Sequence, residues 1–504
     1  MKRVKVIFIN LLMLTVTSLI LRTVNISFNV YLSNRLGPEG MGLFQLISSI
    51  YFLAIVFSIS GIRFASTRLV AEEMGIGNPA GANKAVRNCL VYGLIFSMAT
   101  MIIINLNAEY IGISWLNDAR TILSLRIFAF SLPFISLSSV ISGYFIAVRK
   151  VIMTVLVQYL EQLIKIGTTV LFIGIFLPMG LEYACAAVVL GACAGELCSF
   201  LFLLFLYRTD RPGANKVQAG TRLISRMFNI ALPVAFSGYI MSVVRTIQQL
   251  LIPWGLKKSG ESSGEAIATF GVIQGMAMPV IMFPSVFIEA VCDLIVPELA
   301  ECKASNSYNR LNYIIARVFN LGVLLSIGAA WLFWHFSEEL GMAIYNNAEA
   351  AYFIMMLAPL IPVMYLDNIV DNMLKGIDEQ VSSMRYNIFT SLINVVMTYL
   401  LLPRYAIAGY LITTYFVKII NFGLSINRLI KVTKLTINIK EIVKSILCII
   451  GAIGIALLLD DLNLVNPAMI FLHLLLTAAI YIFLLRVFSC ITHDDVLWLK
   501  SLFK

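Results

Sequence analysis

The chain contains QYLEQLIKIGTT at residues 158–169 and NIFTSLINVVMT at residues 387–398, two mainly apolar stretches whose polar residues recur at the same places. The same shift, about 229 residues, pairs Pro133 with Pro362 and Thr154 with Ser383 without a gap. A repeat of this length inside membrane-spanning sequence indicates a duplicated bundle of helices. Because many secondary transporters are built in this way, the repeat predicts a transporter with its substrate site between the copies.

Composition supports a membrane protein. Of the 504 residues, 60% are hydrophobic and 13% are charged, and the mean hydropathy is +0.90. The apolar residues occur in runs of about 20 or more, enough to cross a hydrocarbon core as helices. These runs predict fourteen spans, near 7–30, 42–62, 84–106, 122–146, 152–176, 184–207, 226–252, 269–295, 313–335, 350–374, 383–402, 406–427, 442–459 and 467–488.

The spans are organised as two copies of six. Because six is an even number, both copies enter the membrane from the same side, which makes the repeat parallel. We therefore expect an all-α integral membrane protein with two six-helix lobes, at 1–207 and 226–430. A cytoplasmic linker at 208–225 joins the lobes, and residues 431–504 add two further helices and a tail.

Lysine and arginine set the expected orientation. They concentrate in alternate loops, so the positive-inside rule places both termini in the cytoplasm. The net charge of +10 expresses this bias. The basic residues form no compact patch, so we do not expect a nucleic-acid-binding protein.

Two arginines lie at like places in the copies. Arg22 belongs to a stripe on the first span with Ser18, Asn25 and Asn29, spaced so that all share one helical face. Arg245 on the seventh span aligns with Arg22 if one loop of the second copy is longer, and it is followed by Gln248. A charge at the bilayer centre costs about 2.5–3.5 kcal/mol on insertion scales, so we expect both arginines to face a cavity.

A guanidinium forks onto phosphate oxygens, so Arg22 and Arg245 are candidate ligands for an anionic group. Arg63 could add a third cation, although its place near a span end also suits a side chain that reaches the interface. The alternative for all three is neutralisation by an acid.

Acidic pairs four residues apart are candidate sites for a coupling ion, H⁺ or Na⁺. They are Asp367 with Asp371, and Glu289 with Asp293. Equally, they could be neutralised within or between helices. Asn387 and Asn394 line the predicted cavity or make interhelical hydrogen bonds.

Nothing in the sequence predicts an enzyme, a metal site or another cofactor. No Walker A sequence occurs, the three histidines are isolated, and the eight cysteines form no spaced framework.

Several segments are similar to those of one transporter family. They include LGPEGMGLF at 36–44, GIRFASTRLVAE at 61–72, IVPELAE at 295–301, LKGI at 374–377 and LPRYAIAG at 402–409. They resemble the polysaccharide exporter branch of the multidrug/oligosaccharidyl-lipid/polysaccharide (MOP) flippase superfamily, and the likeness covers essentially the whole chain.

The resemblance implies a V-shaped pair of lobes that moves a lipid-linked sugar across a bacterial plasma membrane. The expected substrate is an undecaprenyl-pyrophosphate-linked saccharide, such as lipid II or another peptidoglycan precursor for the spore cortex. By analogy with lipid II flippases, Arg22 and Arg245 would bind the pyrophosphate. Arg63 stands where relatives often have a small residue or proline.

Two alternatives remain open. A cation-coupled multidrug exporter of the related multidrug and toxin extrusion (MATE) branch needs a buried carboxylate in its first lobe, and here the first span has arginine instead. A non-transporting scaffold that recruits cell-wall synthases would leave the paired arginines unexplained.

Overall fold

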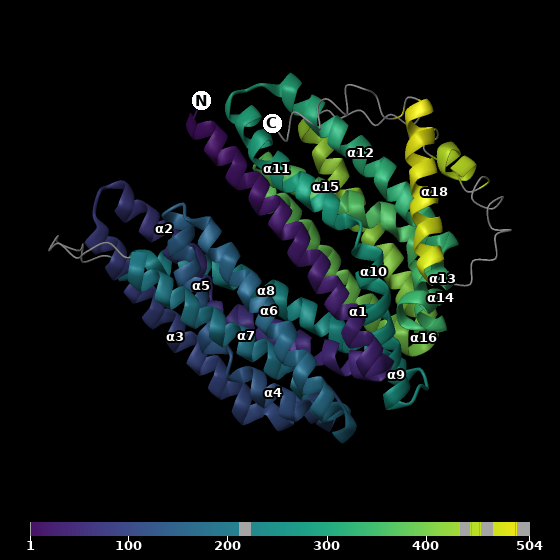
Figure 1. Ribbon diagram of the computed structural model, residues 1–504, viewed down its shortest axis with the longest axis horizontal. Helices are drawn as coiled ribbons and strands as arrows, with labels where there is room; N and C mark the ends of the chain where they lie inside the picture. The colour runs from purple at the N-terminus through teal and green to yellow at the C-terminus, as the bar shows by residue number, and fades with distance from the viewer. Residues whose placement is uncertain are drawn as a thin grey trace. The chain divides into compact units, whose positions relative to one another are not determined.

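The computed structural model describes residues 2–210, 223–433 and 467–488, parts of 444–454 and residue 490, while the side chains of residues 2–18 and 467–471 are outside the description. Within these ranges the chain is helical, with short turns and no strand (Figure 1). It divides into two compact units. The Arg22 unit comprises Met1–Arg35 and Trp254–Lys504, and the Arg245 unit comprises Leu36–Pro253.

The units differ from the predicted lobes at one span each. The Arg22 unit holds the first half of α1 (Lys2–Ile59), and the Arg245 unit holds most of α8 (Leu223–Lys258). The predicted boundaries, which follow the sequence repeat, stay a prediction. Residues 211–222 of the predicted linker, most of the thirteenth span and nearly all of the tail lie outside the described residues.

The Arg245 unit is built from eight helices that follow one another in the chain. Besides the second half of α1 and most of α8, these are α2 (Ile62–Gly75), α3 (Pro79–Tyr110), α4 (Ile122–Ala129), α5 (Leu132–Ala147), α6 (Val151–Phe176) and α7 (Leu181–Asp210), with short helical turns at Ile111–Trp115, Ala119–Thr121 and Leu177–Met179.

The Arg22 unit packs the start of α1 with the helices that follow α8. These are α9 (Ser263–Gly271), α10 (Met278–Met282), α11 (Ser285–Ala304), α12 (Tyr308–His335), α13 (Ser337–Tyr345), α14 (Ala348–Leu357), α15 (Ile361–Gly376), α16 (Gln380–Thr433) and α18 (Pro467–Val487), with short helical turns at Val272–Ala277 and Ala358–Leu360.

The two longest helices are each broken once. A straight helix of 58 residues would be about 87 Å long, far more than the roughly 30 Å of a hydrocarbon core. In α1 the break is at Gly37, with φ 71°, followed by Pro38. Glycine adopts this backbone without strain and proline has no amide hydrogen, so the helix ends and restarts here. In α16 the break is at Ala406, with φ 47°.

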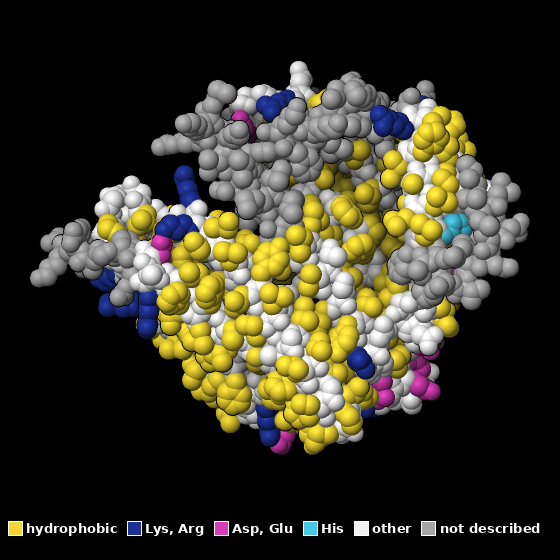
Figure 2. All heavy atoms as spheres, in the orientation of Figure 1, with side chains coloured by type: hydrophobic (Ala, Val, Ile, Leu, Met, Phe, Trp, Pro, Cys, Tyr) yellow, Lys and Arg dark blue, Asp and Glu magenta, His cyan; other side chains and the backbone are white. Residues whose placement is uncertain are grey.

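The chain is a multi-pass membrane protein. Among the described residues, nine helices are long and apolar enough to span a membrane, or ten if Ala119–Ala129 and Leu132–Ala147, bent by 43°, form one span. Hydrophobic side chains are spread over much of the described surface on the face drawn in Figure 2, as lipid contact requires. The predicted number of fourteen stays a prediction, because α1 and α16 are each counted once although each contains a break.

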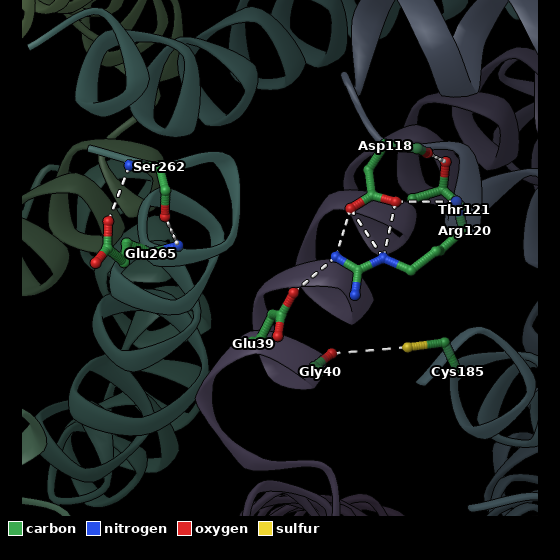
Figure 3. A network of polar contacts seen from close by, with 8 residues as sticks. All are labelled: Glu39, Gly40, Asp118, Arg120, Thr121, Cys185, Ser262 and Glu265. Atoms are coloured by element: carbon green, nitrogen blue, oxygen red, sulfur yellow. Dashed lines mark hydrogen bonds and ion pairs between the residues drawn. The ribbon is translucent and has the colours of Figure 1, made fainter. Parts of the chain in front are cut away.

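A polar network holds one end of the Arg245 unit together (Figure 3). The Arg120 guanidinium binds the Asp118 carboxylate and donates to Glu39 Oε1 at 2.8 Å. The Cys185 thiol of α7 donates to the Gly40 carbonyl at 3.7 Å. These contacts fix the restart of α1 against the turn before α4 and against α7.

In the Arg22 unit, helix α18 is docked on α12 by an aromatic side chain. The Tyr481 hydroxyl donates to the Leu324 carbonyl at 2.9 Å. Gly328 makes room for the ring, because a Cβ there would lie 2.5 Å from a ring carbon of Tyr481. The fourteenth predicted span is therefore packed into this unit.

Candidate functional site

Arg22 lies in the first half of α1, where its guanidinium forms an ion pair with the Glu289 carboxylate of α11. Asn368 of α15 donates to Glu289 Oε1 at 3.2 Å and holds that carboxylate in place. One turn further along α11, Asp293 interacts electrostatically with Arg22 and with Lys375 of α15. Three helices thus bring two cations and two carboxylates together.

The pair between Arg22 and Glu289 is accessible. Their side chains are 40% and 27% exposed. A guanidinium in this position keeps its charge and can exchange one oxyanion for another. Arg22 can therefore bind a phosphate group once the Glu289 carboxylate moves away from the guanidinium.

Helix α15 carries two polar stripes because it contacts two partners. Asn368, Asn372 and Lys375 are spaced four and three apart and extend from Glu289, with the Asn372 amide donating to Asn368 Oδ1 at 2.9 Å and Lys375 donating to Asn372 Oδ1 at 3.2 Å. Asp367 and Asp371 are four apart on the face that meets α16. The two sets are told apart by their partners, because Asn368 contacts Glu289 of α11 whereas Asp367 and Asp371 contact side chains of α16.

The stripe on the α16 side forms a buried hydrogen-bonded network. Asp367 is 7% exposed, and both its oxygens accept from the Asn421 amide, at 3.0 and 2.8 Å. Asp371 accepts from the Ser383 hydroxyl at 2.7 Å and from the Asn387 amide at 2.9 Å. The Asn421 amide also donates to Asn387 Oδ1 at 3.1 Å, which joins the two halves.

The groups around the two carboxylates donate hydrogen bonds to them, and the same amides and hydroxyls also carry oxygen atoms that can accept a hydrogen bond. Lys418 also acts on Asp367 electrostatically. Among the described residues no group of three or more His, Cys, Asp or Glu side chains could hold a metal.

An apolar cavity of about 1100 Å³ lies within the Arg22 unit. Its walls come from α1, α11, α12 and α18, and Phe287, Leu321 and Leu475 are among the lining side chains. On α1 the lining residues include Ile26 and Val30. At 100° per residue, Ile26 and Val30 lie about 40° and 80° around the helix from Arg22. One helix therefore presents a cationic stripe and the wall of an apolar cavity.

Arg245 lies on α8 in the other unit, in different surroundings. Helix α8 is anchored there by Thr246, which donates to the Ser49 carbonyl at 3.3 Å, and by Tyr239, which stacks on Phe57 with ring centres 4.3 Å apart. The Arg245 side chain is exposed and forms no ion pair with any described residue. Gln248 is half-buried one turn away.

The structure brings some of the predicted site residues together. Arg22 meets Glu289 and Asp293, and Asp367, Asp371 and Asn387 share one network. Asn25 and Asn29 lie on α1 in the same unit, Asn394 accepts from Thr398 at 3.3 Å, and the Ser18 side chain is outside the described residues.

Arg63 begins α2 in the Arg245 unit and is exposed, so its role, like that of Arg245, stays a prediction. The expected coupling ion and the expected association with cell-wall synthases also stay predictions.

Asn368 and Asn421 join the networks but were not predicted. Each is a polar residue in an apolar span. One signal was available for both, namely the free-energy cost of placing a polar side chain in a bilayer. For Asn421 a second signal was the following Ser425, four residues on, whose hydroxyl donates to Asp371 at 3.3 Å.

Comparison with known proteins agrees with the sequence motifs. The model of a family described as polysaccharide biosynthesis protein matches residues 7–300, and the MatE family model matches residues 257–400. Stage V sporulation protein B of Bacillus subtilis (strain 168) is 24% identical over 506 residues, which cover 96% of this chain and 96% of that protein. Lipid II flippase MurJ of the same organism is 21% identical over 361 residues, covering 65% of each chain.

Solved structures match the fold. A lipid II flippase MurJ in an inward closed conformation aligns with a TM-score of 0.74 at 15% identity, covering 95% of this chain and 98% of that one. An inward-facing MATE family transporter of the MOP superfamily aligns with a TM-score of 0.63 at 14% identity, covering 84% and 100%. The fold is therefore the one found in MOP superfamily transporters.

Proposed function

The chain belongs to the polysaccharide biosynthesis protein family, and we propose that it is a flippase that moves a lipid-linked saccharide across the plasma membrane. The substrate we propose is an undecaprenyl-pyrophosphate-linked saccharide, a peptidoglycan precursor such as lipid II. Two relatives support this choice through their names, one a lipid II flippase and the other a sporulation protein. Spore-cortex synthesis is the process we propose for it.

One observation carries the proposal: the first half of α1 places a cation beside an apolar cavity. A lipid-linked saccharide has an anionic pyrophosphate and a long hydrocarbon chain, and it needs a binding site of each kind. Arg22 suits the pyrophosphate because a guanidinium binds two phosphate oxygens at once. The cavity suits isoprenoid units because its walls are nearly all apolar.

In this proposal Arg22 binds the pyrophosphate, and the stripe of Asn25 and Asn29 contacts the polar head beyond it. The hydrocarbon chain lies in the apolar cavity and extends into the bilayer. Arg245 supplies a second cation in another state of the transport cycle. Alternating access between the two membrane faces, with both termini in the cytoplasm, completes the mechanism.

We propose a proton as the coupling ion, bound at Asp367 or Asp371. A carboxyl group that gains a proton becomes a hydrogen-bond donor at one oxygen, so the donors Asn421, Asn387 and Ser383 would rearrange. Because these side chains belong to α15 and to both sides of the break in α16, their rearrangement would shift helices.

The test is translocation in proteoliposomes. A fluorescent lipid II derivative is placed in both leaflets, and the fraction that reaches the outer leaflet is followed by chemical quenching. We expect the wild type to exceed protein-free vesicles, Arg22→Gln to lose the activity, and Arg35→Gln to keep it. Arg35 is the matched control because it is an exposed arginine on the same helix that contacts the Tyr31 ring. Equal rates for Arg22→Gln and wild type would reject the site.

A cation-coupled exporter of the MATE type is the second candidate, favoured by the match of residues 257–400 to the MatE model and by the buried Asp367 within that range. Its test is efflux of a cationic dye from cells. Efflux that Asp367→Asn abolishes and Arg22→Gln leaves unchanged would favour the exporter over the flippase.

A further inference from the structure

In the structure, Glu289 is bound to the Arg22 guanidinium, which is the group that the proposed function assigns to binding the substrate pyrophosphate. Glu289 is positioned for this contact from two sides, by the guanidinium and by the Asn368 amide at 3.2 Å. A carboxylate bound to arginine imitates a phosphate oxygen in charge and geometry. In the free protein, Glu289 therefore stands in the place of an anionic ligand.

Charge counting shows what a ligand would change. Glu289 contacts Arg22 from α1 and Asn368 from α15. Asp293, one turn along α11, interacts electrostatically with Arg22 and with Lys375 of α15, and so completes the charged cluster. With two cations and two carboxylates, the cluster is neutral. A pyrophosphate diester carries about two negative charges, and a site within membrane spans would hold them without compensation. Uncompensated charge in such surroundings is strongly unfavourable.

We propose that Glu289 is an internal counter-anion that the pyrophosphate displaces from Arg22, and that the displaced carboxylate takes up one proton from solvent. This inference rests on the proposed function. Proton uptake converts the carboxylate to a neutral carboxyl, and no other bond changes. The protonation of Glu289 offsets one of the negative charges that the ligand brings into the cluster. Asn368 then remains as the partner of Glu289.

Two consequences follow by linkage. Substrate binding takes up about one proton, and affinity rises as pH falls, because protons and substrate favour the same state. Release is favoured where Glu289 loses its proton and pairs again with Arg22. Re-formation of the pair between Arg22 and Glu289 therefore favours release of the ligand, and no further binding partner is needed for this step.

Glu289→Gln separates this role from a structural one. Glutamine keeps the length of the side chain and can still hydrogen-bond with Asn368, but it neither competes as an anion nor titrates. The control is Glu301→Gln, which removes the same charge from the same helix at an exposed position. The wild type tests the proton count without any substitution.

The experiment is calorimetric titration of the full-length protein in detergent with geranylgeranyl-pyrophosphoryl-N-acetylglucosamine as the probe, because its pyrophosphate is a diester, like that of the proposed substrate, and does not itself titrate near pH 7. Titrations at pH 7 in two buffers of different ionisation enthalpy give the number of protons taken up. We expect about one proton for the wild type and for Glu301→Gln. For Glu289→Gln we expect none, about tenfold tighter binding at pH 8, and a flat pH profile.

The outcomes distinguish failure of the proposed pyrophosphate site at Arg22 from failure of the inference about Glu289. Arg22-dependent binding without proton uptake in the wild type would overturn the inference and leave the proposed site intact. Unchanged uptake in Glu289→Gln would do the same. Absence of binding, or binding that Arg22→Gln does not weaken, would overturn the proposed site and this inference together.

Discussion

Arg22 and Arg245 stand at like positions on the first helix of each sequence copy, yet among the residues that the structure describes only Arg22 has an ion-pair partner. Arg22 meets Glu289. The repeat, with its shift of about 229 residues, places Ser60 where the second copy has Glu289. The Ser60 hydroxyl is hydrogen-bonded to Tyr239 of α8 and, at 3.0 Å, to Tyr92. Duplication has kept the cation in both copies and the counter-anion in only one.

The buried acids differ between the units in a similar way. The shift pairs Asp371 with Ser142 and Glu196 with Ser425, so each copy has a hydroxyl where the other has a carboxylate. In the Arg245 unit, Glu196 of α7 interacts electrostatically with Glu161 and Lys165 of α6. Lysine lies among the acids there, whereas asparagine and serine surround Asp371. The two units therefore use different means to keep acids inside spans.

The largest effect we expect is from the arginines. Arg22→Gln should lower flipping about 100-fold, because it removes the phosphate ligand and leaves Glu289 without its cation. Arg245→Gln should lower flipping about tenfold, since no carboxylate is left unpaired. Proteoliposome translocation measures both.

The double variant Arg22→Gln with Glu289→Gln separates the two effects of losing Arg22. It should recover thermal stability and remain inactive. Equal losses in Arg22→Gln and Arg245→Gln would contradict the asymmetry between the units.

The second prediction concerns the acids. Asp371→Asn should reduce transport driven by a pH gradient about tenfold, because the network would lose one of its two titratable carboxylates. Glu196→Gln should reduce it only a few-fold, since Lys165 still has Glu161 as a partner. Initial rates with and without an imposed gradient give the comparison, and a larger loss for Glu196→Gln would move the coupling site to the other unit.

The third prediction tests how closely α6 and α7 pack. A Cβ at Gly195 would lie 2.9 Å from the Glu161 carbonyl oxygen, so Gly195→Ala should destabilise the protein by about 1–3 kcal/mol. Gly167→Ala on α6 is the control, because a Cβ there meets nothing within 4 Å and alanine favours a helix. Thermal unfolding in detergent is the measurement, and equal melting temperatures would show that the helices can separate freely.

The smallest effect concerns ion pairs that close each unit with opposite polarity. In the Arg22 unit Glu379 binds Arg428 at 2.9 Å, while in the Arg245 unit Lys150 binds Asp210, and the shift of about 229 pairs Glu379 with Lys150. Hydrogen bonds from Ser382 and Arg428 lower the pKa of Glu379 below its usual 4.5.

A lowered folded-state pKa means that this contribution is complete above pH 4.5 and is lost as pH falls through the folded-state value. Glu379→Gln should therefore cost about 1 kcal/mol or less at pH 7 and nothing once Glu379 is protonated in both states. Unfolding by denaturant at pH 7 and at pH 3.5 tests this sign. A larger cost of Glu379→Gln at pH 3.5 would contradict it.

Much of the fold could be predicted from the sequence because apolar runs and a long repeat are strong signals. The acidic pairs were found as well, since a spacing of four is visible within one helix. The partnership of Arg22 with Glu289 could not be predicted, because no spacing rule joins residues on different helices. The sequence also could not show that one helix, α1, serves both the cationic cluster and the apolar cavity.

Asn368 and Asn387 illustrate the limit. Asn387 was noticed because the repeat aligned it with Gln158, whereas Asn368, which the same shift pairs with Ser139, was not singled out. A single polar residue in a span is unfavourable in the bilayer, but the sequence does not show where its hydrogen-bond partner lies. Only the packing of the helices shows which neighbour forms that hydrogen bond.

The most direct test of the account is head-group selectivity in proteoliposomes. Two fluorescent lipids with the same sugar and the same polyprenyl chain are compared, one joined through pyrophosphate and one through a neutral linkage. The account predicts that the wild type moves the pyrophosphate lipid and leaves the neutral lipid at the rate of protein-free vesicles. Equal movement of both lipids, or of neither, would contradict the claim that Arg22 selects an anionic head group.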